Sequence, residues 1–333
     1  MARDSKREIS RRQFILRSAK AGLSIVGAGC VGYFLYDPEG PDASIATSEI
    51  VKIPDFSIAG KKPEMCIAQG QDRAETLKRA VKAMGGMESF ISKGDRVLLK
   101  VNAAFASPPA LSATTHPQLV SAVTRLCLEA GASSVVVTDN PINDPSSCFA
   151  LTGIAEAARK AGARVFIPEK EHFKPVTLEK GQLIRNWPVL HAPFKGINKL
   201  IGLAPVKDHS RSGASMTMKN WYGLLGGRRN IFHQDIHNII KELAMMVKPS
   251  LVILDGITTM MTNGPTGGSL SDIKQTDTLI VSNDQVAADA FGATLLGRKS
   301  RDLPYIIKAE ALGLGTANYM SLAPKYVSAG RSG

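Results

Sequence analysis

The basic segment, residues 205–229, concentrates basic side chains among glycines and other small residues. Lys207 and Lys219 could supply point charges to an anion, and His209 could supply a hydrogen-bond donor near neutral pH. The run 212–215 (SGAS) looks like the entry loop of a following helix, where backbone N–H groups favour negative charge. The segment therefore predicts a site for a carboxylate or phosphate, with a mobile basic loop as the alternative. Arg229, near its end, is expected at the surface.

A second turn-rich segment, residues 263–268 (NGPTGG), could also face a ligand. Gly264, Gly267 and Gly268 leave backbone N–H groups free to point at an anion, and Thr266 adds a hydroxyl. No lysine follows these glycines as in a P-loop, and no strand–GxGxxG–helix order is present, so neither nucleotide motif is predicted. A plain tight loop is the alternative.

His233 and His237 have the i, i+4 spacing that places two side chains on one face of a helix. The same spacing occurs in zinc sites, but Gln234 stands where a zinc protease has glutamate. A histidine pair without a third ligand is an incomplete metal site. Histidines packed at an internal interface are the alternative.

Apolar, strand-like runs alternate with helical patterns along most of the chain. This alternation predicts an α/β fold with a mostly parallel sheet and helices on both of its faces. Residues 1–46 are expected to form an export signal or membrane anchor, residues 47–62 a linker, and residues 63–325 a single domain. The expected strands include residues 96–101, 134–138, 200–204, 251–254 and 278–281.

Polar side chains follow nearly every expected strand. Because the carboxyl ends of parallel strands meet at one edge of a sheet, where ligands bind, these side chains are expected to share one pocket. His209 is the candidate proton donor, and Lys100 with Asp255 completes the site. The expected catalytic residues are His209, Lys219, Lys100 and Asp255. The expected ligand-binding residues are Lys207, Asn220, His116, Asn102, Gly264, Thr266, Gly267 and Gly268.

Two acidic residues near the C-terminal end of this pattern have structural interpretations. Asp284 precedes a helical pattern and is expected to cap that helix. Asp289 lies on the alanine-rich helix itself, where a buried carboxylate needs a partner. Lys100 or Lys219 would fit that role.

Several short motifs, in this order and spacing, resemble the domain of unknown function 362 family, over residues 64–297. The resemblance implies a fold and a site without implying a settled reaction. Many relatives carry, or occur beside, ferredoxin-type iron–sulfur modules. This chain lacks their cysteine motif, so a redox reaction here would need a partner as electron carrier. The motifs are residues 94–102 (GDRVLLKVN), 114–117 (TTHP), 219–220 (KN), 255–256 (DG), 264–268 (GPTGG) and 283–297 (NDQVAADAFGATLLG).

The N-terminal segment resembles a twin-arginine export signal. Residues 10–16 (SRRQFIL) combine paired arginines with an aromatic residue and a leucine, and an apolar run follows at 19–36. The small residues 44–46 (SIA) predict cleavage after residue 46. A retained anchor is the alternative, because the apolar run approaches the length that spans a bilayer. We expect passage through the twin-arginine translocase to the periplasm or the extracytoplasmic membrane face.

Charge and cysteine content narrow the classes of partner. The 333 residues carry a net charge of +12, and loss of residues 1–46 would leave +10, which suits an anionic ligand, an anionic membrane or an acidic protein. The export signal and the lack of interleaved aromatic and basic residues argue against nucleic acid. Cys66, Cys127 and Cys148 form no C-x-x-C motif, so no iron–sulfur cluster is expected within this chain, although one disulfide stays open.

Two functions fit these observations. The first is an enzyme, or an enzyme-like subunit, that binds an anionic small molecule or an unknown cofactor and serves an extracytoplasmic redox-linked pathway. The alternative is a non-catalytic binding or assembly protein that docks onto a ferredoxin-type iron–sulfur membrane partner. Turnover of a ligand would separate them.

Overall fold

The computed structural model describes residues 11–12, 14–18, 20, 22 and 52–328. Chain contacts divide the protein into two compact units, Met1–Glu49 and Ile50–Gly333. In the first unit the described residues are helical. Most of the apolar run and the expected cleavage site lie outside the described residues. Within the described part of the chain, no helix is both long and apolar enough to cross a membrane.

In the second unit, the described residues place nine strands in one sheet, in the order β11-β1-β10-β9-β7-β2-β3-β4, with β8 paired to β7. Its parallel pairs are β1–β11, β2–β3, β2–β7, β3–β4 and β7–β9. The strands are β1 (Met65–Gln69), β2 (Arg96–Lys100), β3 (Ser134–Thr138), β4 (Arg164–Phe166), β7 (Lys199–His209), β8 (Gly213–Ser215), β9 (Leu251–Met260), β10 (Ile273–Ser282) and β11 (Lys325–Ser328). A separate hairpin joins β5 (Phe173–Val176) and β6 (Trp187–Leu190).

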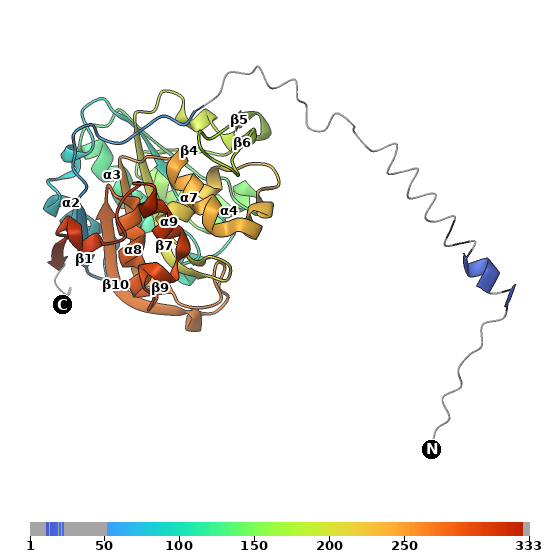
Figure 1. The fold of residues 1–333 in the computed structure, drawn as a ribbon. Coiled ribbons are helices and arrows are strands. Elements are labelled where there is room, and N and C mark those ends of the chain that lie inside the picture. The colour runs from blue at the N-terminus through green and yellow to red at the C-terminus, as the bar shows by residue number, and fades with distance from the viewer. Residues whose placement is uncertain (1–10, 13, 19, 21, 23–51, 329–333) are drawn as a thin grey trace. The chain divides into compact units, whose positions relative to one another are not determined.

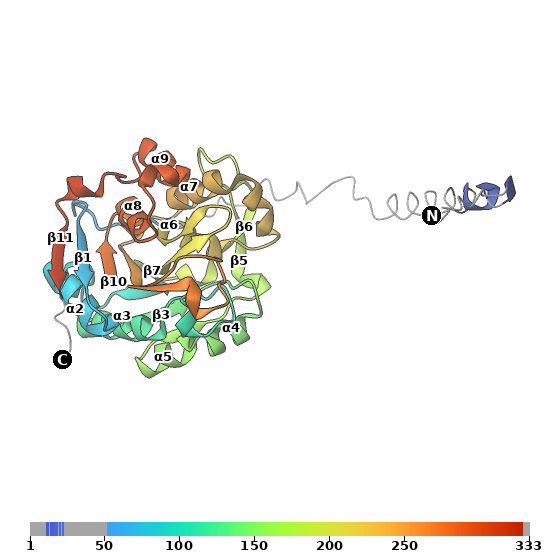
Figure 2. The ribbon, with the colours of Figure 1, turned by 90° about the horizontal axis from the view of Figure 1, so that it is seen from below.

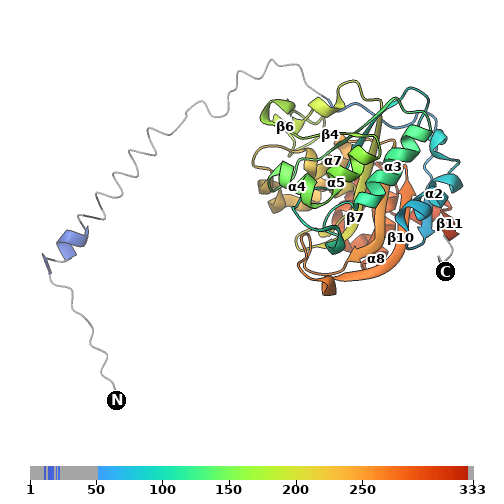
Figure 3. The same cartoon turned by 180° about the vertical axis from the view of Figure 1, so that it is seen from behind.

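Helices cover both faces of this sheet, which confirms the predicted fold class (Figures 1 and 3). One group packs on the face seen in Figure 3 and comprises α2 (Arg73–Ala83), α3 (Pro117–Glu129) and α5 (Ile154–Lys160), with α4 (Pro145–Leu151) beside α5. The opposite group comprises α6 (Thr217–Asn220), α7 (Ile236–Met246), α8 (Gln285–Leu295) and α9 (Pro304–Ala311). Figure 2 shows the sheet between the two groups.

Two hydrophobic cores follow from the alternation of side chains along each strand. Leu98 on β2 and Leu254 on β9 point into the core beneath α7 and α8. Leu99 and Ile253, the next or preceding residues, point into the core beneath α2 and α3. Successive side chains of a strand point to opposite faces, so a sheet that is buried on both faces needs apolar residues at consecutive positions.

Part of the expected linker belongs to the folded domain. Ile53 and Phe56 are buried, and Phe56 is only 3% exposed. The backbone N–H of Phe56 donates to the carbonyl of Lys248, and the hydroxyl of Ser250 donates to the carbonyl of Phe56. The expectation of a linker over residues 47–62 is therefore wrong from Ile53 onward, because Ile53 and Phe56 pack into the core of the domain.

The basic segment that looked like a loop begins as two strands and continues into α6. Lys207 and His209 lie on the last part of β7, which pairs with β8 in a tight antiparallel hairpin. A register shift between Pro205 and Lys207 lets β7 continue beyond the sheet edge. The alternative of a mobile loop is therefore wrong.

The helix N-terminus at which an anion was expected, that of α6, already binds the side chain of Asp289. Helix α6 is only four residues long, and the carboxylate of Asp289 accepts from the N–H groups of Thr217 and Met218, at 2.7 and 3.2 Å. Burial raises the pKa of Asp289 to about 7. Its partners are thus backbone groups and the Thr217 hydroxyl, and not Lys100 or Lys219. Asp284 caps α8 as predicted.

Candidate functional site

A buried cavity of about 80 Å³ lies at the carboxyl ends of β2 and β3, against the β7–β8 hairpin and α6. This is the edge of the sheet at which parallel strands gather polar groups. The chain returns to the cavity from six separate segments. The side chains that line it include Lys100, Asn102, Phe105, Asp139, Lys207, His209, Lys219, Asn220, Tyr222, Arg229 and His233.

Lys100 at the end of β2 forms a buried ion pair with Asp139. Its Nζ lies 2.7 Å from Asp139 Oδ1 and also donates to the carbonyls of Val101 and Asn220. Burial lowers the pKa of Lys100, and the carboxylate of Asp139 opposes that shift. Asp139 also accepts from the backbone N–H groups of Ala103 and Asn140. Both members of the pair are thus fully hydrogen-bonded, and the pair is a fixed wall of the cavity.

Asn220 braces this wall and does not point free donors at a ligand. Its Oδ1 accepts from Lys100 Nζ at 3.1 Å, and its Nδ2 donates to the carbonyls of Lys100 and Leu203. Asn102 lines the same cavity. The KN motif at 219–220 therefore contributes one buried amine that faces the cavity and one amide that is used in internal hydrogen bonds.

Lys207 enters the cavity from β7 with one hydrogen bond. Its Nζ donates to the carbonyl of Ala113 and lies 5.2 Å from the centre of the Phe105 ring. Burial, followed by the neighbouring charge of Lys219, lowers the pKa of Lys207 to about 7. An ammonium group has three donors, so two remain for a ligand.

Lys219 enters from α6 and is only 8% exposed. Its Nζ lies 5.0 Å from the centre of the Tyr222 ring, and within residues 52–328 it donates to no oxygen and meets no carboxylate. Burial and the charges of Arg229 and Lys100 lower the pKa of Lys219 to about 7. Lys219 is therefore the amine of the cavity with the least internal compensation.

Arg229, which was expected at the surface, lies at the mouth of the cavity. Its Nη1 donates to the carbonyls of Tyr222 and Leu225, and its Nη2 to those of Asn140 and Pro141. These four bonds hold the guanidinium in place, and burial lowers its pKa while Asp139 opposes the shift. Sequence reasoning missed Arg229 because an arginine after two glycines is typical of a solvated turn.

His209 is held as a neutral imidazole. Its Nδ1 accepts from the backbone N–H groups of Arg211 and Ser212, at 3.2 and 3.3 Å, so the ring proton belongs on Nε2. The ring stacks on His233 at 5.8 Å. Burial and the charge of Lys219 lower the pKa of His209 to about 2. At neutral pH His209 can donate a hydrogen bond through Nε2, but it does not carry the extra proton that a general acid would give up.

The charges around the cavity do not balance. Lys100, Lys207, Lys219 and Arg229 face it, and Asp139 supplies the carboxylate. Buried charges are costly unless they are paired. The described residues thus leave an excess of positive charge that an anionic ligand would neutralise.

A wider, open groove of about 850 Å³ adjoins the cavity. The two share a wall formed by Asn140, Ile142, Tyr222, Arg229 and His233. The groove is also lined by Phe173 and Pro188 from the β5–β6 hairpin and by the charged Glu169 and Lys170. The groove and the cavity therefore lie next to each other, with the five shared side chains between them.

Asp255 and His116 lie away from Lys100, although the sequence analysis grouped the three together. Asp255 pairs with Arg73 of α2 at 2.7 Å. Asp255 lies two residues after Ile253 on β9, and its side chain therefore points to the face that carries α2 and α3. Lys100 lies two residues after Leu98 on β2, and its side chain points to the opposite face. His116 caps α3, near Arg73 and Asp255, and burial lowers its pKa to about 4.

The turn-rich segment, residues 263–268, also lies mostly apart from the cavity. Pro265 lines the cavity, while Gly264 packs against the backbone of Asp208. Thr266 and Gly268 are exposed, and Gly267 lies against Met260 and Asp272. Hydrogen bonds from Thr262 and Asn263 to Asp272 close the segment on itself. The alternative of a tight structural loop fits this placement.

His233 and His237 do not share a helical face. His233 lies in the 3₁₀ segment Arg229–Asp235, where it contacts Tyr222, and α7 begins only at Ile236. His237 stacks on Tyr305. The described residues contain no group of three or more side chains suited to hold a metal ion. The i, i+4 argument assumed one continuous helix, and the helix starts too late.

The three cysteines of the folded unit are buried and free. Burial raises the pKa of the Cys66 and Cys148 thiols to about 11 and that of Cys127 to about 12. The structure therefore pairs none of these three in the disulfide that the sequence left open.

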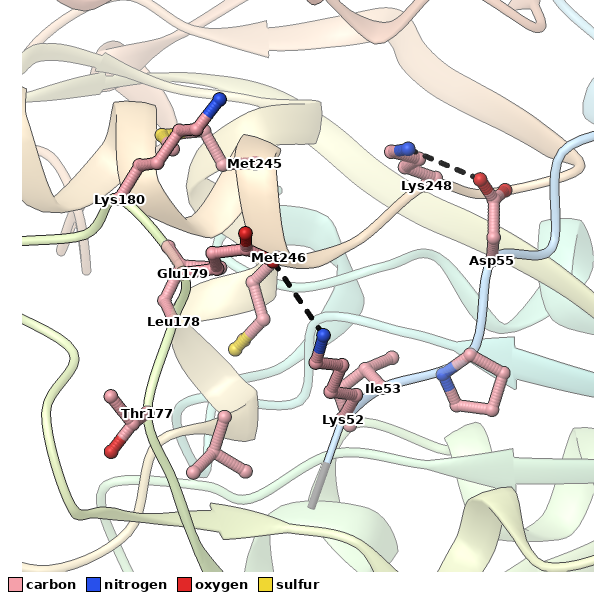
Figure 4. A pocket seen from close by; sticks show the side chains of 12 residues that line it. Lys52, Ile53, Asp55, Thr177, Leu178, Glu179, Lys180, Met245, Met246 and Lys248 are labelled. Carbon is pink, nitrogen blue, oxygen red and sulfur yellow. Dashed lines mark hydrogen bonds and ion pairs between the residues drawn. The ribbon is translucent and has the colours of Figure 1, made fainter. Parts of the chain in front are cut away.

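Another pocket, of about 350 Å³, lies between residues 52–55, residues 176–180 and the end of α7 (Figure 4). Four of its five charged residues form two ion pairs: Lys52 lies 3.6 Å from Glu179, and Lys248 lies 3.2 Å from Asp55. The fifth, Lys180, is exposed to solvent, so this pocket lacks the buried, uncompensated charge of the cavity.

Comparison with known proteins gives one family and two individual matches. The family model "Domain of unknown function (DUF362)" matches residues 97–294. A thylakoid-associated protein of Synechocystis sp. is 26% identical over 262 residues, which cover 72% of this chain and 74% of the relative. A crystal structure of a Thermotoga maritima protein aligns with a TM-score of 0.34 and 11% identity over 73% of this chain. The chain spans only 60% of that structure, and a TM-score of this size carries no argument about fold.

The family match agrees with the resemblance drawn from the short motifs. It includes the strand that ends in Lys100, the hairpin that carries Lys207 and His209, and the helix that holds Lys219. Because the matched region is more than half of the chain, the protein belongs to the family defined by the domain of unknown function DUF362.

Proposed function

We propose that the protein binds a small anionic molecule in the cavity formed by Lys100, Lys207, Lys219 and Arg229. The observation that carries this proposal is the excess of buried positive charge over the one carboxylate, Asp139. An anion there would accept hydrogen bonds from Lys207 and Lys219, whose amines have donors to spare. Charge-assisted hydrogen bonds of this kind are about twice as strong as neutral ones.

The shape of the site favours a ligand with a small charged head and a larger body. The cavity has room for a carboxylate or phosphate with a few neighbouring atoms. The adjoining groove is wider and partly apolar, with Tyr222 and Phe173 in its walls. The head would lie among the lysines and the body along the groove.

We propose further that this binding takes place outside the cytoplasm. The twin-arginine-like segment at residues 10–16 supports export, and the relative in Synechocystis is named as thylakoid-associated. The family resemblance supports a role in a redox-linked pathway with a ferredoxin-type iron–sulfur partner. Replacement of Arg11 and Arg12 by lysine should retain the protein in the cytoplasm, as measured by cell fractionation, and normal export of that variant would contradict the proposal.

The binding proposal is tested on protein purified after export from its own host. Native mass spectrometry shows whether a ligand is already held, and calorimetry with phosphate and with propanoate measures binding to the emptied protein. Lys207→Ala and Lys219→Ala should each weaken binding by about tenfold or more, as expected for loss of a hydrogen bond to a charged group. Lys274→Ala, at an exposed position on β10, is the control. Failure of both anions to bind the unaltered protein would overturn the proposal.

A further inference from the structure

We propose that Lys219 forms an imine with the carbonyl carbon of a small oxo acid whose carboxylate lies against Lys207. The inference rests on the proposed anion site and adds a covalent step to it. It assigns different roles to the two lysines that share the cavity. Lys207 binds the charge of the ligand, and Lys219 reacts with it.

The hydrogen-bond partners separate the cationic residues of the cavity. Lys100 uses its donors on Asp139, Val101 and Asn220, and the guanidinium of Arg229 is held by four backbone carbonyls. Lys207 is held by one carbonyl, that of Ala113. Lys219 has no oxygen acceptor among the described residues, so its nitrogen is the one that a carbonyl carbon can approach.

The surroundings of Lys219 also supply the neutral amine that attack on a carbonyl requires. Its pKa is lowered to about 7 by burial and by the charges of Arg229 and Lys100, so about half of the amines are unprotonated at pH 7. A desolvated lysine beside other cations is a recognised way to activate an amine as a nucleophile. The titratable and charged groups that face it are Lys100, Lys207, Arg229, Asp139, His209, His233 and Tyr222.

His209 provides a second group for the same step. Because its Nδ1 accepts from two backbone N–H groups, its Nε2–H is available to the cavity. A fixed neutral donor can bind the carbonyl oxygen as negative charge develops on it. The pKa of His209, lowered to about 2, keeps the ring neutral while the amine of Lys219 titrates.

The step balances without an oxidant, a reductant or a metal. The nitrogen of Lys219 forms a bond to the carbonyl carbon, and the electron pair of the C=O π bond moves to oxygen, which takes up a proton. The carbinolamine then loses its hydroxyl group as water; one of the two protons comes from the nitrogen, and the other comes from solvent, which received it when the ammonium form of Lys219 was deprotonated. The net change joins the ammonium form of Lys219 and the oxo acid into an iminium ion and one water, with total charge conserved.

The experiment traps the imine by reduction. The exported protein is incubated near neutral pH with pyruvate or with acetoacetate in the presence of sodium cyanoborohydride, and adducts are located by intact mass and peptide mapping. The expected result is a mass gain equal to one reduced oxo acid, located on Lys219. Trapping there should be at least about tenfold faster than at exposed lysines, whose ordinary pKa leaves few neutral amines.

Lys219→Arg is the matched variant, because it keeps the cation and cannot form the imine. It should lose the adduct while its affinity for propanoate, which has no carbonyl to trap, falls by less than about tenfold. Thermal unfolding checks that this variant is folded. Should it not fold, the unaltered protein gives the same test, since propanoate should protect Lys219 from trapping.

The outcomes distinguish this inference from the proposed function. Binding of propanoate without an adduct on Lys219 from either oxo acid would overturn the imine and leave the anion site standing. Adducts spread over surface lysines would overturn it equally. If propanoate and phosphate both fail to bind, the anion site itself fails.

Discussion

Lys219 shows what it costs to bury a charge without a partner. Its ammonium form lies against Tyr222 with no carboxylate, and its pKa is lowered to about 7. Replacement of Lys219 by methionine should therefore stabilise the ligand-free protein by about 1–3 kcal/mol, because an apolar chain of similar length removes the desolvation cost. The same variant should lose most of its affinity for propanoate. Urea unfolding and calorimetry measure the two effects.

The opposite signs of these two effects make the prediction sharp. Lys274→Met, at an exposed position, should change neither quantity beyond about 0.5 kcal/mol. A Lys219→Met protein that is less stable than the parent would show that the amine has an internal partner. The site would then lack its proposed excess of charge.

Asp139 presents the converse case, a buried charge whose partner is essential. Asp139→Asn would leave Lys100 buried without a counter-ion and should destabilise the protein by about 3–5 kcal/mol, measured by urea unfolding. Addition of Lys100→Met to this variant should restore part of the loss, since the uncompensated ammonium is then gone. Additive effects of the two changes would contradict a coupled pair.

At the residue scale, the sequence predicted the lysines better than their partners. Lys100, Lys207 and Lys219 were expected in one pocket, and the structure brings them to one cavity. Asp139 carried a usable signal, because it directly follows β3 and Lys100 pairs in register with Thr138. Arg229 carried none, because its place depends in part on the carbonyls of Asn140 and Pro141, which are far away in the sequence.

At the scale of elements, side-chain parity decided which groups could meet. The apolar residues of β2 and β9 alternate between the two cores, and that alternation already places Lys100 and Asp255 on opposite faces. The sequence contained this information. In a continuously apolar strand, however, no alternation of polar and apolar residues shows which side chains share a face. The start of α7 at Ile236, after His233, was less accessible, because helix boundaries depend on tertiary contacts that the local sequence does not show.

The short 3₁₀ helix Trp221–Leu224, which directly follows α6, needs a glycine at position 223. A side chain there would overlap the carboxylate of Asp139 and lie 2.6 Å from Lys100 Nζ. Gly223→Ala should thus push the ion pair apart, with a loss of about 2–4 kcal/mol in unfolding free energy and weaker binding of propanoate. Gly268→Ala is the matched control, since nothing lies within 4 Å of its added carbon. Equal stability of the two variants, measured by urea unfolding, would contradict the packing argument.

At the scale of the whole molecule, topology positions the site. Parallel strands β2, β3 and β7 end at one edge, and the hairpin of β7 with β8 extends that edge so that Lys207 and Lys219 face the ends of its neighbours. The rule that ligands bind at the carboxyl ends of parallel strands was sufficient to choose the edge. It could not choose the spatial order of the strands, in which β10 runs antiparallel to its neighbours β9 and β1, and β11 pairs in parallel with β1.

The uncompensated lysines should also set how the stability of the whole protein depends on pH. Unfolding returns Lys207 and Lys219 from a pKa of about 7 to their ordinary value of 10.5, so the unfolded chain binds more protons between these limits. The free energy of unfolding of the ligand-free protein should therefore rise with pH through that window, with the full penalty present below pH 7. Thermal unfolding from about pH 6 to about pH 9 measures this slope, and Lys219→Met should flatten it.

A bound anion should act against that slope. Propanoate pairs with the ammonium forms, so its affinity should fall as the pH rises through about 7 and the lysines lose their protons. The stabilisation that excess propanoate provides, RT ln(1 + [L]/Kd), should accordingly be largest below pH 7 and shrink above it. The two pH dependences have opposite signs and a common cause in the same two amines. A ligand-free protein whose stability falls with pH in this window, together with pH-independent binding, would place the neutralising charge somewhere other than these lysines.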